Sequence, residues 1–80
     1  MRILGNIHHP NMRITVFTMN DKYIIRFEAG LMEQLFKISQ TEINGIESIE
    51  KMLDEEFIKK IIDRFNEMFL SFNSAKERIK

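Results

Sequence analysis

The alternation of apolar and polar residues over 12–28 constrains the fold more than any other feature of the chain. In its first half, Met12, Ile14 and Val16 share one parity. Side chains two positions apart lie on the same face of a strand, so this alternation predicts strands with one face against a core. The dipeptide Asn20-Asp21 follows, and both residue types tolerate positive φ, which favours a tight hairpin. The segment therefore predicts an antiparallel hairpin.

Turn signals on both sides extend this hairpin into a meander. His9-Pro10-Asn11 predicts a turn before it, and Ala29-Gly30 predicts a turn after it. Pro10 favours a turn of type I or II, which allows a first loop longer than two residues. We expect strands over about 2–8, 12–19, 22–28 and 32–39.

Two-residue loops at Asn20-Asp21 and Ala29-Gly30 define a register that lines up the apolar residues. The expected cross-strand pairs are Leu4–Phe17, Ile7–Ile14, Val16–Ile25, Ile14–Phe27, Arg13–Glu28, Phe27–Met32, Arg26–Glu33 and Ile24–Leu35. One face then carries the expected core, which comprises Ile3, Ile7, Ile14, Val16, Tyr23, Ile25, Phe27, Met32 and Phe36. Gly5 lies among them, where the missing side chain would let a helix approach closely. A glycine bulge at Gly30 is the alternative, and it would shift the fourth strand by one and put Glu33 in the core.

The pattern changes to helical spacing after Thr41. Ile43, Ile46, Ile49 and Leu53 predict a short helix over about 44–53. Asp54 suits the N-cap of a second helix over about 55–78. That helix carries an apolar stripe of Phe57, Ile58, Ile61, Ile62, Phe65, Met68, Phe69 and Phe72. The expected fold is one α+β domain, a four-stranded antiparallel β-meander followed by a short helix and a long C-terminal amphipathic helix packed on one face of the sheet.

Composition narrows the function classes. The 12 basic residues equal the 12 acidic ones, so the chain lacks the basic excess typical of nucleic-acid binders. It has no cysteine, no apolar run long enough to span a membrane, and no apolar stretch typical of a signal peptide at its start. We therefore expect a cytoplasmic protein that binds neither nucleic acid nor membrane.

The second face of the sheet carries apolar residues that need a cover. In the expected register, Leu4, Phe17, Ile24 and Leu35 form one row, and such a row left in water is unusual for a monomer. The long helix, at roughly 36 Å, also overhangs strands of roughly 27 Å. We expect a homodimer, the commonest oligomer, with a self-association surface of Leu4, Phe17, Met19, Ile24, Leu35, Phe69 and Phe72. The alternatives are that the short helix covers this face, or that the long helix breaks near Ser71 and folds back.

One polar cluster is a candidate site. It comprises His8, Arg13, Arg26, Glu28 and Glu33 on the second face, where a histidine beside a carboxylate could bind a ligand or transfer a proton. Cross-strand ion pairs on a solvated sheet explain the same residues, and no nucleophile accompanies them. His8 and His9, adjacent on a strand, would point to opposite faces and so could not share a metal.

We therefore expect no catalytic, cofactor or metal site. The favoured function is a non-enzymatic interaction module that self-associates. The alternative is a small ligand-binding or catalytic protein that uses the polar cluster.

Several stretches resemble a family of short uncharacterised bacterial proteins. They are Ile7-His8-His9-Pro10, residues 14–17, residues 20–28, Glu33-Gln34 after Gly30, and residues 53–57. The resemblance covers nearly the whole chain. It implies a free-standing small protein and no particular activity.

Overall fold

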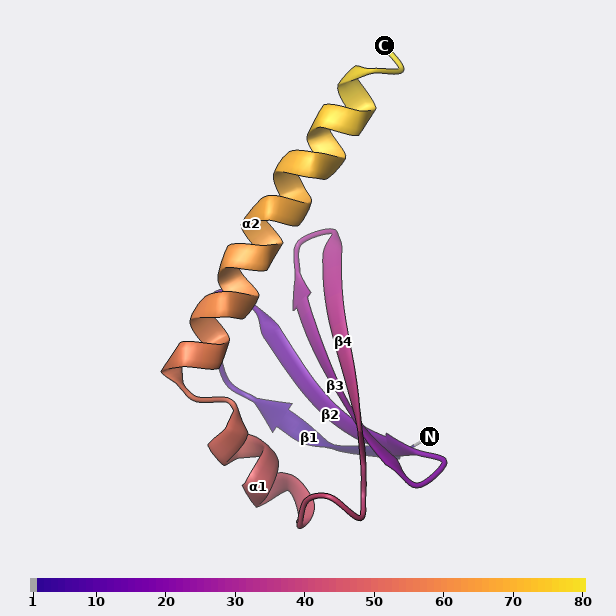
Figure 1. Ribbon diagram of the computed structural model, residues 1–80, viewed down its shortest axis with the longest axis vertical. Coiled ribbons are helices and arrows are strands. Elements are labelled where there is room, and N and C mark those ends of the chain that lie inside the picture. Colours follow the sequence, from indigo (N-terminus) through magenta and orange to yellow (C-terminus); the bar gives the residue numbers. More distant parts are fainter. Residues whose placement is uncertain (1) are drawn as a thin grey trace.

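The computed structural model describes residues 2–80 and has four strands followed by two helices. The strands are β1 (Arg2–Ile7), β2 (Arg13–Met19), β3 (Lys22–Ala29) and β4 (Met32–Ser39), and they form one antiparallel sheet in chain order. The helices are α1 (Gly45–Met52) and α2 (Glu55–Glu77). Both helices lie along the same side of the sheet (Figure 1). The predicted α+β fold is confirmed, and each element ends within one residue of its expected boundary.

The central hairpin has the predicted turn and register. Asn20 and Asp21 adopt φ values of 51° and 63°, which is the pattern of a type I′ turn. Val16 is paired with Ile25, and the neighbouring pairs follow as expected along β2 and β3. Because the twist of this turn matches that of the strands it joins, local turn chemistry is enough to determine the pairing.

The first strand departs from the expected register at a β-bulge. From Gly5 to Ile7 the pairing with β2 is as predicted, but the register shifts between Ile3 and Gly5. Phe17 is therefore paired with Ile3, and the expected Leu4–Phe17 pair is wrong. One extra residue reverses which face the preceding side chains occupy. Ile3 consequently leaves the core face and is exposed, against the prediction.

The last strand is displaced by two residues from its predicted pairing. The loop is Gly30-Leu31, so Ala29 is paired with Met32. The expected pairs Phe27–Met32, Arg26–Glu33 and Ile24–Leu35 are wrong, and Phe27–Gln34, Arg26–Leu35 and Ile24–Lys37 are observed. Gly30 supplies the positive φ of 59° that the displaced loop needs. A shift of two preserves the faces, so Met32 stays on the core side, and the alternative with Glu33 in the core is also wrong.

The core lies between the helices and one face of the sheet. Its buried members are Met12, Ile14, Val16, Ile25, Phe27, Ile49, Ile61 and Phe65. The rings of Phe27, Phe36 and Phe57 meet edge to face, with centroids 5.5–6.1 Å apart. The expected core residue Phe36 is thus in contact with the core but remains partly exposed on β4, an edge strand.

Helix α2 is continuous. Asp54 caps it by accepting a hydrogen bond from the backbone N–H of Phe57 at 2.9 Å, as predicted. The helix runs without a break through Ser71 to Glu77, so it does not fold back. Because α1 packs on the core side, it does not cover the second face either. No helix within residues 2–80 is long and apolar enough to cross a membrane.

Gly5 allows the close approach of α1 that its sequence position predicts. A Cβ atom at Gly5 would lie 3.4 Å from Cδ1 of Ile46, which is ordinary contact for alanine, whereas the methyl groups of a branched side chain would crowd that atom. We expect Gly5→Val to lower the free energy of unfolding by about 1–3 kcal/mol, as overpacking does. Gly5→Ala should change it by less than about 1 kcal/mol. Urea denaturation followed by circular dichroism measures both.

A second variant checks the cause. Ile46→Ala added to Gly5→Val should recover part of the lost stability, because it removes the obstructing methyl group. If Gly5→Val is as stable as the wild type, the close approach of α1 is contradicted.

Candidate functional site

A hollow of about 580 Å³ lies beside the first loop, at the polar end of the open face, the face of the sheet away from the helices. Its polar lining comes from β1, β2, β3 and the loop between the first two strands: Asn6, His8, His9, Arg13, Thr15 and Arg26. Apolar residues, including Ile3 and Met12, complete the wall. The hollow is thus built by three neighbouring strands and one loop.

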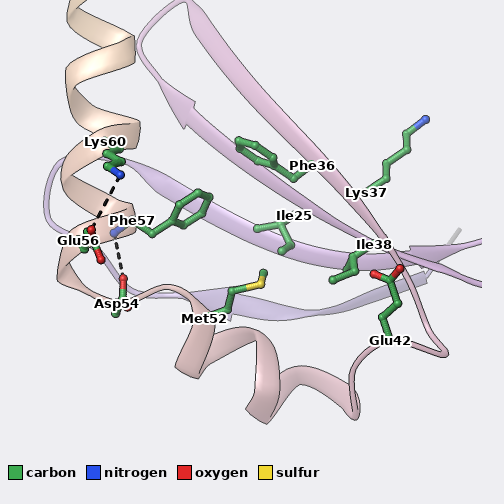
Figure 2. Close-up of a pocket in the computed structure, with 10 residues that line it drawn as sticks. All are labelled: Ile25, Phe36, Lys37, Ile38, Glu42, Met52, Asp54, Glu56, Phe57 and Lys60. Carbon is green, nitrogen blue, oxygen red and sulfur yellow. Dashed lines mark hydrogen bonds and ion pairs between the residues drawn. The ribbon is translucent and has the colours of Figure 1, made fainter.

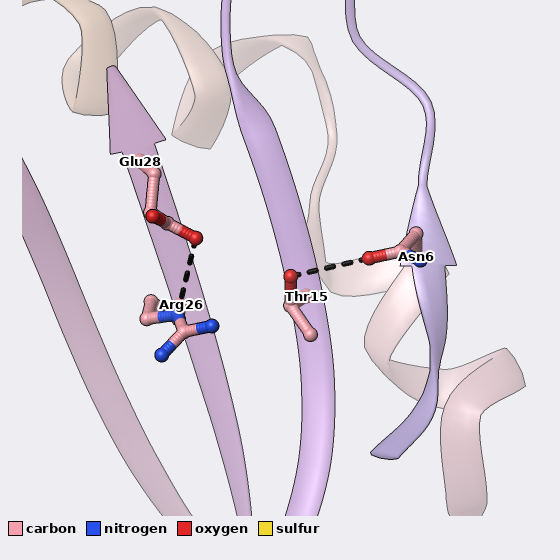
Figure 3. A network of polar contacts seen from close by, with 4 residues as sticks. All are labelled: Asn6, Thr15, Arg26 and Glu28. Carbon is pink, nitrogen blue, oxygen red and sulfur yellow. Dashed lines mark hydrogen bonds and ion pairs between the residues drawn. The ribbon is translucent and has the colours of Figure 1, made fainter. Parts of the chain in front are cut away.

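The structure brings together three of the five predicted cluster residues. His8, Arg13 and Arg26 all line the hollow. Glu28 lies beside it and forms an ion pair with Arg26, from Oε1 to Nε at 3.3 Å, although its cross-strand neighbour is Arg13 (Figure 3). Glu33 is not part of the lining, because the displaced register of β4 sets it opposite Glu28.

Arg26 has two structural roles. Its guanidinium lies over the ring of Phe17, 5.4 Å from the ring centroid, which is a cation–π distance. Its Nε and Oε1 of Glu28 are both shielded from solvent and attract each other without hydrogen-bond geometry. Figure 3 shows the two terminal nitrogens of Arg26 on the side away from Glu28.

Three further polar residues of the lining, Asn6, His9 and Thr15, were not among the predicted site residues. Thr15 is buried, and its hydroxyl donates to Oδ1 of Asn6 at 3.2 Å (Figure 3). His9 accepts a hydrogen bond at Nδ1 from the backbone N–H of Asn11 at 3.1 Å. The first strand ends at Ile7, so His8 and His9 lie in the loop that follows it, and both line the hollow. Within residues 2–80, no group of three or more His, Cys, Asp or Glu could hold a metal ion.

A second cavity, of about 510 Å³, lies where β4 faces the start of α2 (Figure 2). Its wall is mostly apolar and includes Phe36, Met52 and Phe57. Two of its three acidic residues have structural partners. Asp54 caps α2, and Glu56 lies 3.9 Å from Lys60 as an i,i+4 pair, and both stabilise the start of the helix. The third, Glu42, lines the cavity together with Lys37.

The apolar part of the open face is better covered than the sequence predicts. Phe17 is 5% exposed and Ile24 is 2% exposed, although no helix lies over them. Part of this cover comes from Arg26, which lies over the ring of Phe17. Leu4, Met19 and Leu35 remain exposed, and Leu35 is not in the predicted row because Lys37 is opposite Ile24.

The displaced register of β4 creates a pair of like charges, and one substitution can remove their repulsion. Glu28 and Glu33 are directly opposite on β3 and β4, and like charges in this position destabilise a sheet. We expect Glu33→Lys to raise the free energy of unfolding by about 0.2–1 kcal/mol, measured by urea denaturation at low ionic strength. The gain should shrink in high salt, because exposed charges are screened. A loss of stability would contradict the observed register of β4.

Comparison of the chain with models of known protein families, with curated proteins and with solved structures finds no match. The resemblance to a family of short bacterial proteins therefore stays a prediction.

Proposed function

We propose that this chain is a non-enzymatic interaction module that forms a homodimer through the free end of α2. The observation that carries the proposal is an apolar helix stripe longer than the surface it packs on. Ile61 and Phe65 are buried against the sheet, whereas Phe69 and Phe72 on the same stripe are 56% and 46% exposed.

The lengths of the elements explain this overhang. A helix of 23 residues is about 34 Å long. The part of α2 beyond Phe65 contributes about 18 Å of that length at 1.5 Å per residue. Figure 1 shows this part rising past the tip of the β3–β4 hairpin. Met68 still packs against the edge of the core, whereas the side chains of Phe69 and Phe72 remain largely exposed.

The hairpin tip adds a second apolar element at the same end of the molecule. Leu31 is 87% exposed in the β3–β4 loop. Together with Met32 it forms one wall of an open groove, and Met68 and Phe72 of α2 form part of the other. The end of α2 from one copy of the chain could therefore insert into the groove of another copy.

A second copy of the chain is the occupant that best fits this surface. A two-fold axis sets one patch against its own copy, so a single patch is sufficient. Aromatic side chains bury about 150–250 Å² each, so the exposed halves of Phe69 and Phe72 together offer roughly 150–250 Å². Leu31 and Ile79 are 87% and 86% exposed and add to this apolar area. A standard interface buries about 800 Å² per partner, of which a little over half is apolar, and these four side chains would form its apolar centre.

The proposed contact surface keeps the helix residues expected from the sequence but leaves out the residues of the open face. Phe17 and Ile24 are already covered within one chain and offer little to a partner. Leu4, Met19 and Leu35 are exposed on the open face, but polar residues separate Leu35 from the other two. We therefore assign the contact to the helix end and the hairpin tip.

Charge at the centre of the helix patch should abolish the dimer. We expect the wild type to have a mass near twice 9.6 kDa in light scattering at tens of micromolar. The double variant Phe69→Glu/Phe72→Glu should scatter as a monomer, because charges are depleted at interface cores. Its circular dichroism spectrum and melting temperature should remain close to those of the wild type, since both side chains lie outside the core.

Two controls locate the contact. Leu70 is exposed on α2 about 100° around the helix from Phe69, so Leu70→Glu should leave the dimer intact. Leu35→Glu places the same charge on the open face and should also leave it intact. A monomeric wild type would contradict the proposal, and so would a dimer that survives Phe69→Glu/Phe72→Glu. A dimer lost only in Leu35→Glu would move the contact to the sheet.

A further inference from the structure

The hollow beside the first loop has a strongly one-sided charge. Its described lining contains two arginines and two histidines but no aspartate or glutamate. The chain as a whole has no net charge. The nearest carboxylate in the cluster, that of Glu28, is already paired with Nε of Arg26. The charge of Arg13 is therefore the one in the hollow without a paired carboxylate.

Two hydrogen bonds within the lining occupy acceptor atoms of Asn6 and His9, so the N–H donors of these two side chains remain available to a ligand. Oδ1 of Asn6 accepts from the hydroxyl of Thr15, so the amide NH₂ of Asn6 is left to donate. Nδ1 of His9 accepts from the backbone N–H of Asn11. A histidine that accepts at Nδ1 carries its proton at Nε2, which is therefore also a donor.

Arg13 adds donors without partners, whereas Arg26 is already engaged by Glu28 at Nε and by the ring of Phe17. Arg13 is exposed, and within residues 2–80 its side chain makes no hydrogen bond or ion pair. The terminal nitrogens of Arg26 lie on the side away from Glu28 (Figure 3). A guanidinium presents its N–H groups in a planar fork that matches two oxygens of one anion.

We propose that this hollow binds a small organic oxyanion, a carboxylate or a phosphate monoester. Arg13 and Arg26 would hold the anion, and Asn6 and His9 would donate to its remaining oxygens. Ile3 would contact the hydrocarbon part of the ligand, because it is an exposed apolar residue of the wall. This site lies within one chain and does not depend on the proposed dimer.

A small molecule fits the hollow better than RNA. Proteins that bind single-stranded RNA stack its bases mainly on aromatic side chains, and no Phe, Tyr or Trp lines the hollow. Phe17 on the same face is buried beneath Arg26, and Phe27 is in the core. The neutral chain also lacks the extended basic surface that backbone binding needs.

Titration monitored by amide NMR shifts tests the site with three probes: inorganic phosphate, phenyl phosphate and benzoate. We expect saturable shifts confined to residues 6–15 and to Arg26 and its strand neighbours. Phenyl phosphate should bind more tightly than inorganic phosphate, because only the ester reaches the apolar wall. The comparison of phenyl phosphate with benzoate distinguishes a phosphate site from a carboxylate site.

Substitution of one arginine supplies the quantitative check. A hydrogen bond to a charged group is worth about 1.5–3 kcal/mol, so Arg13→Gln should weaken phenyl phosphate binding by roughly 10- to 100-fold. Arg13 is exposed, so this variant should fold normally. Lys22→Gln removes the same charge from an exposed position at the far end of β3 and should change the affinity less than about twofold.

Three outcomes would overturn the proposal. The first is the absence of saturable shifts with all three probes. The second is an equal loss of affinity in Arg13→Gln and Lys22→Gln, which would indicate non-specific attraction. The third is binding of a single-stranded RNA oligonucleotide at these residues with no response to the small anions.

Discussion

The burial of Ile61 and Phe65 in the same core as Ile14 and Phe27 holds α2 against the sheet, and the rest of the molecule depends on that contact. Deleting a large apolar side chain from such a core costs about 2–5 kcal/mol, a large share of the stability of an 80-residue domain. The contact also fixes which turns of α2 are supported. Because the packed stripe continues beyond Phe65, anchoring one half of the helix leaves the other half apolar and free.

The apolar residues on the two faces of the sheet are covered in different ways. Both helices cover the core face, and Gly5 makes room for α1 there. The open face instead covers its own apolar residues, as Arg26 does for Phe17. This arrangement links stability to the candidate site, because Arg26 covers a buried ring, pairs with Glu28 and also lines the hollow. The proposed self-association surface and the proposed anion site lie on different parts of the chain, so neither excludes the other.

Much of the candidate site could be predicted from the strand pattern, but its chemistry could not. Alternation and the first turn placed His8, Arg13 and Arg26 near one another, and all three line the hollow. The roles of Asn6 and His9 depend on which of their atoms are already hydrogen-bonded. That information is not in residue spacing, because it follows from side-chain orientation across strands and within a loop. The position of Glu33 was missed for a similar reason, since it depends on the register of β4.

The sequence by itself determined the order of the elements, the type I′ turn at Asn20-Asp21 and the length of the apolar helix stripe. These features depend on turn chemistry and periodicity, which are encoded within a few neighbouring residues. Only the tertiary structure decided the bulge before Gly5, the Gly30-Leu31 loop and the end of the supported part of α2. Each of these is selected by contacts between segments far apart in the chain. A shift of two residues preserves the faces of a strand, so the alternation of β4 is equally consistent with either pairing, and packing makes the choice.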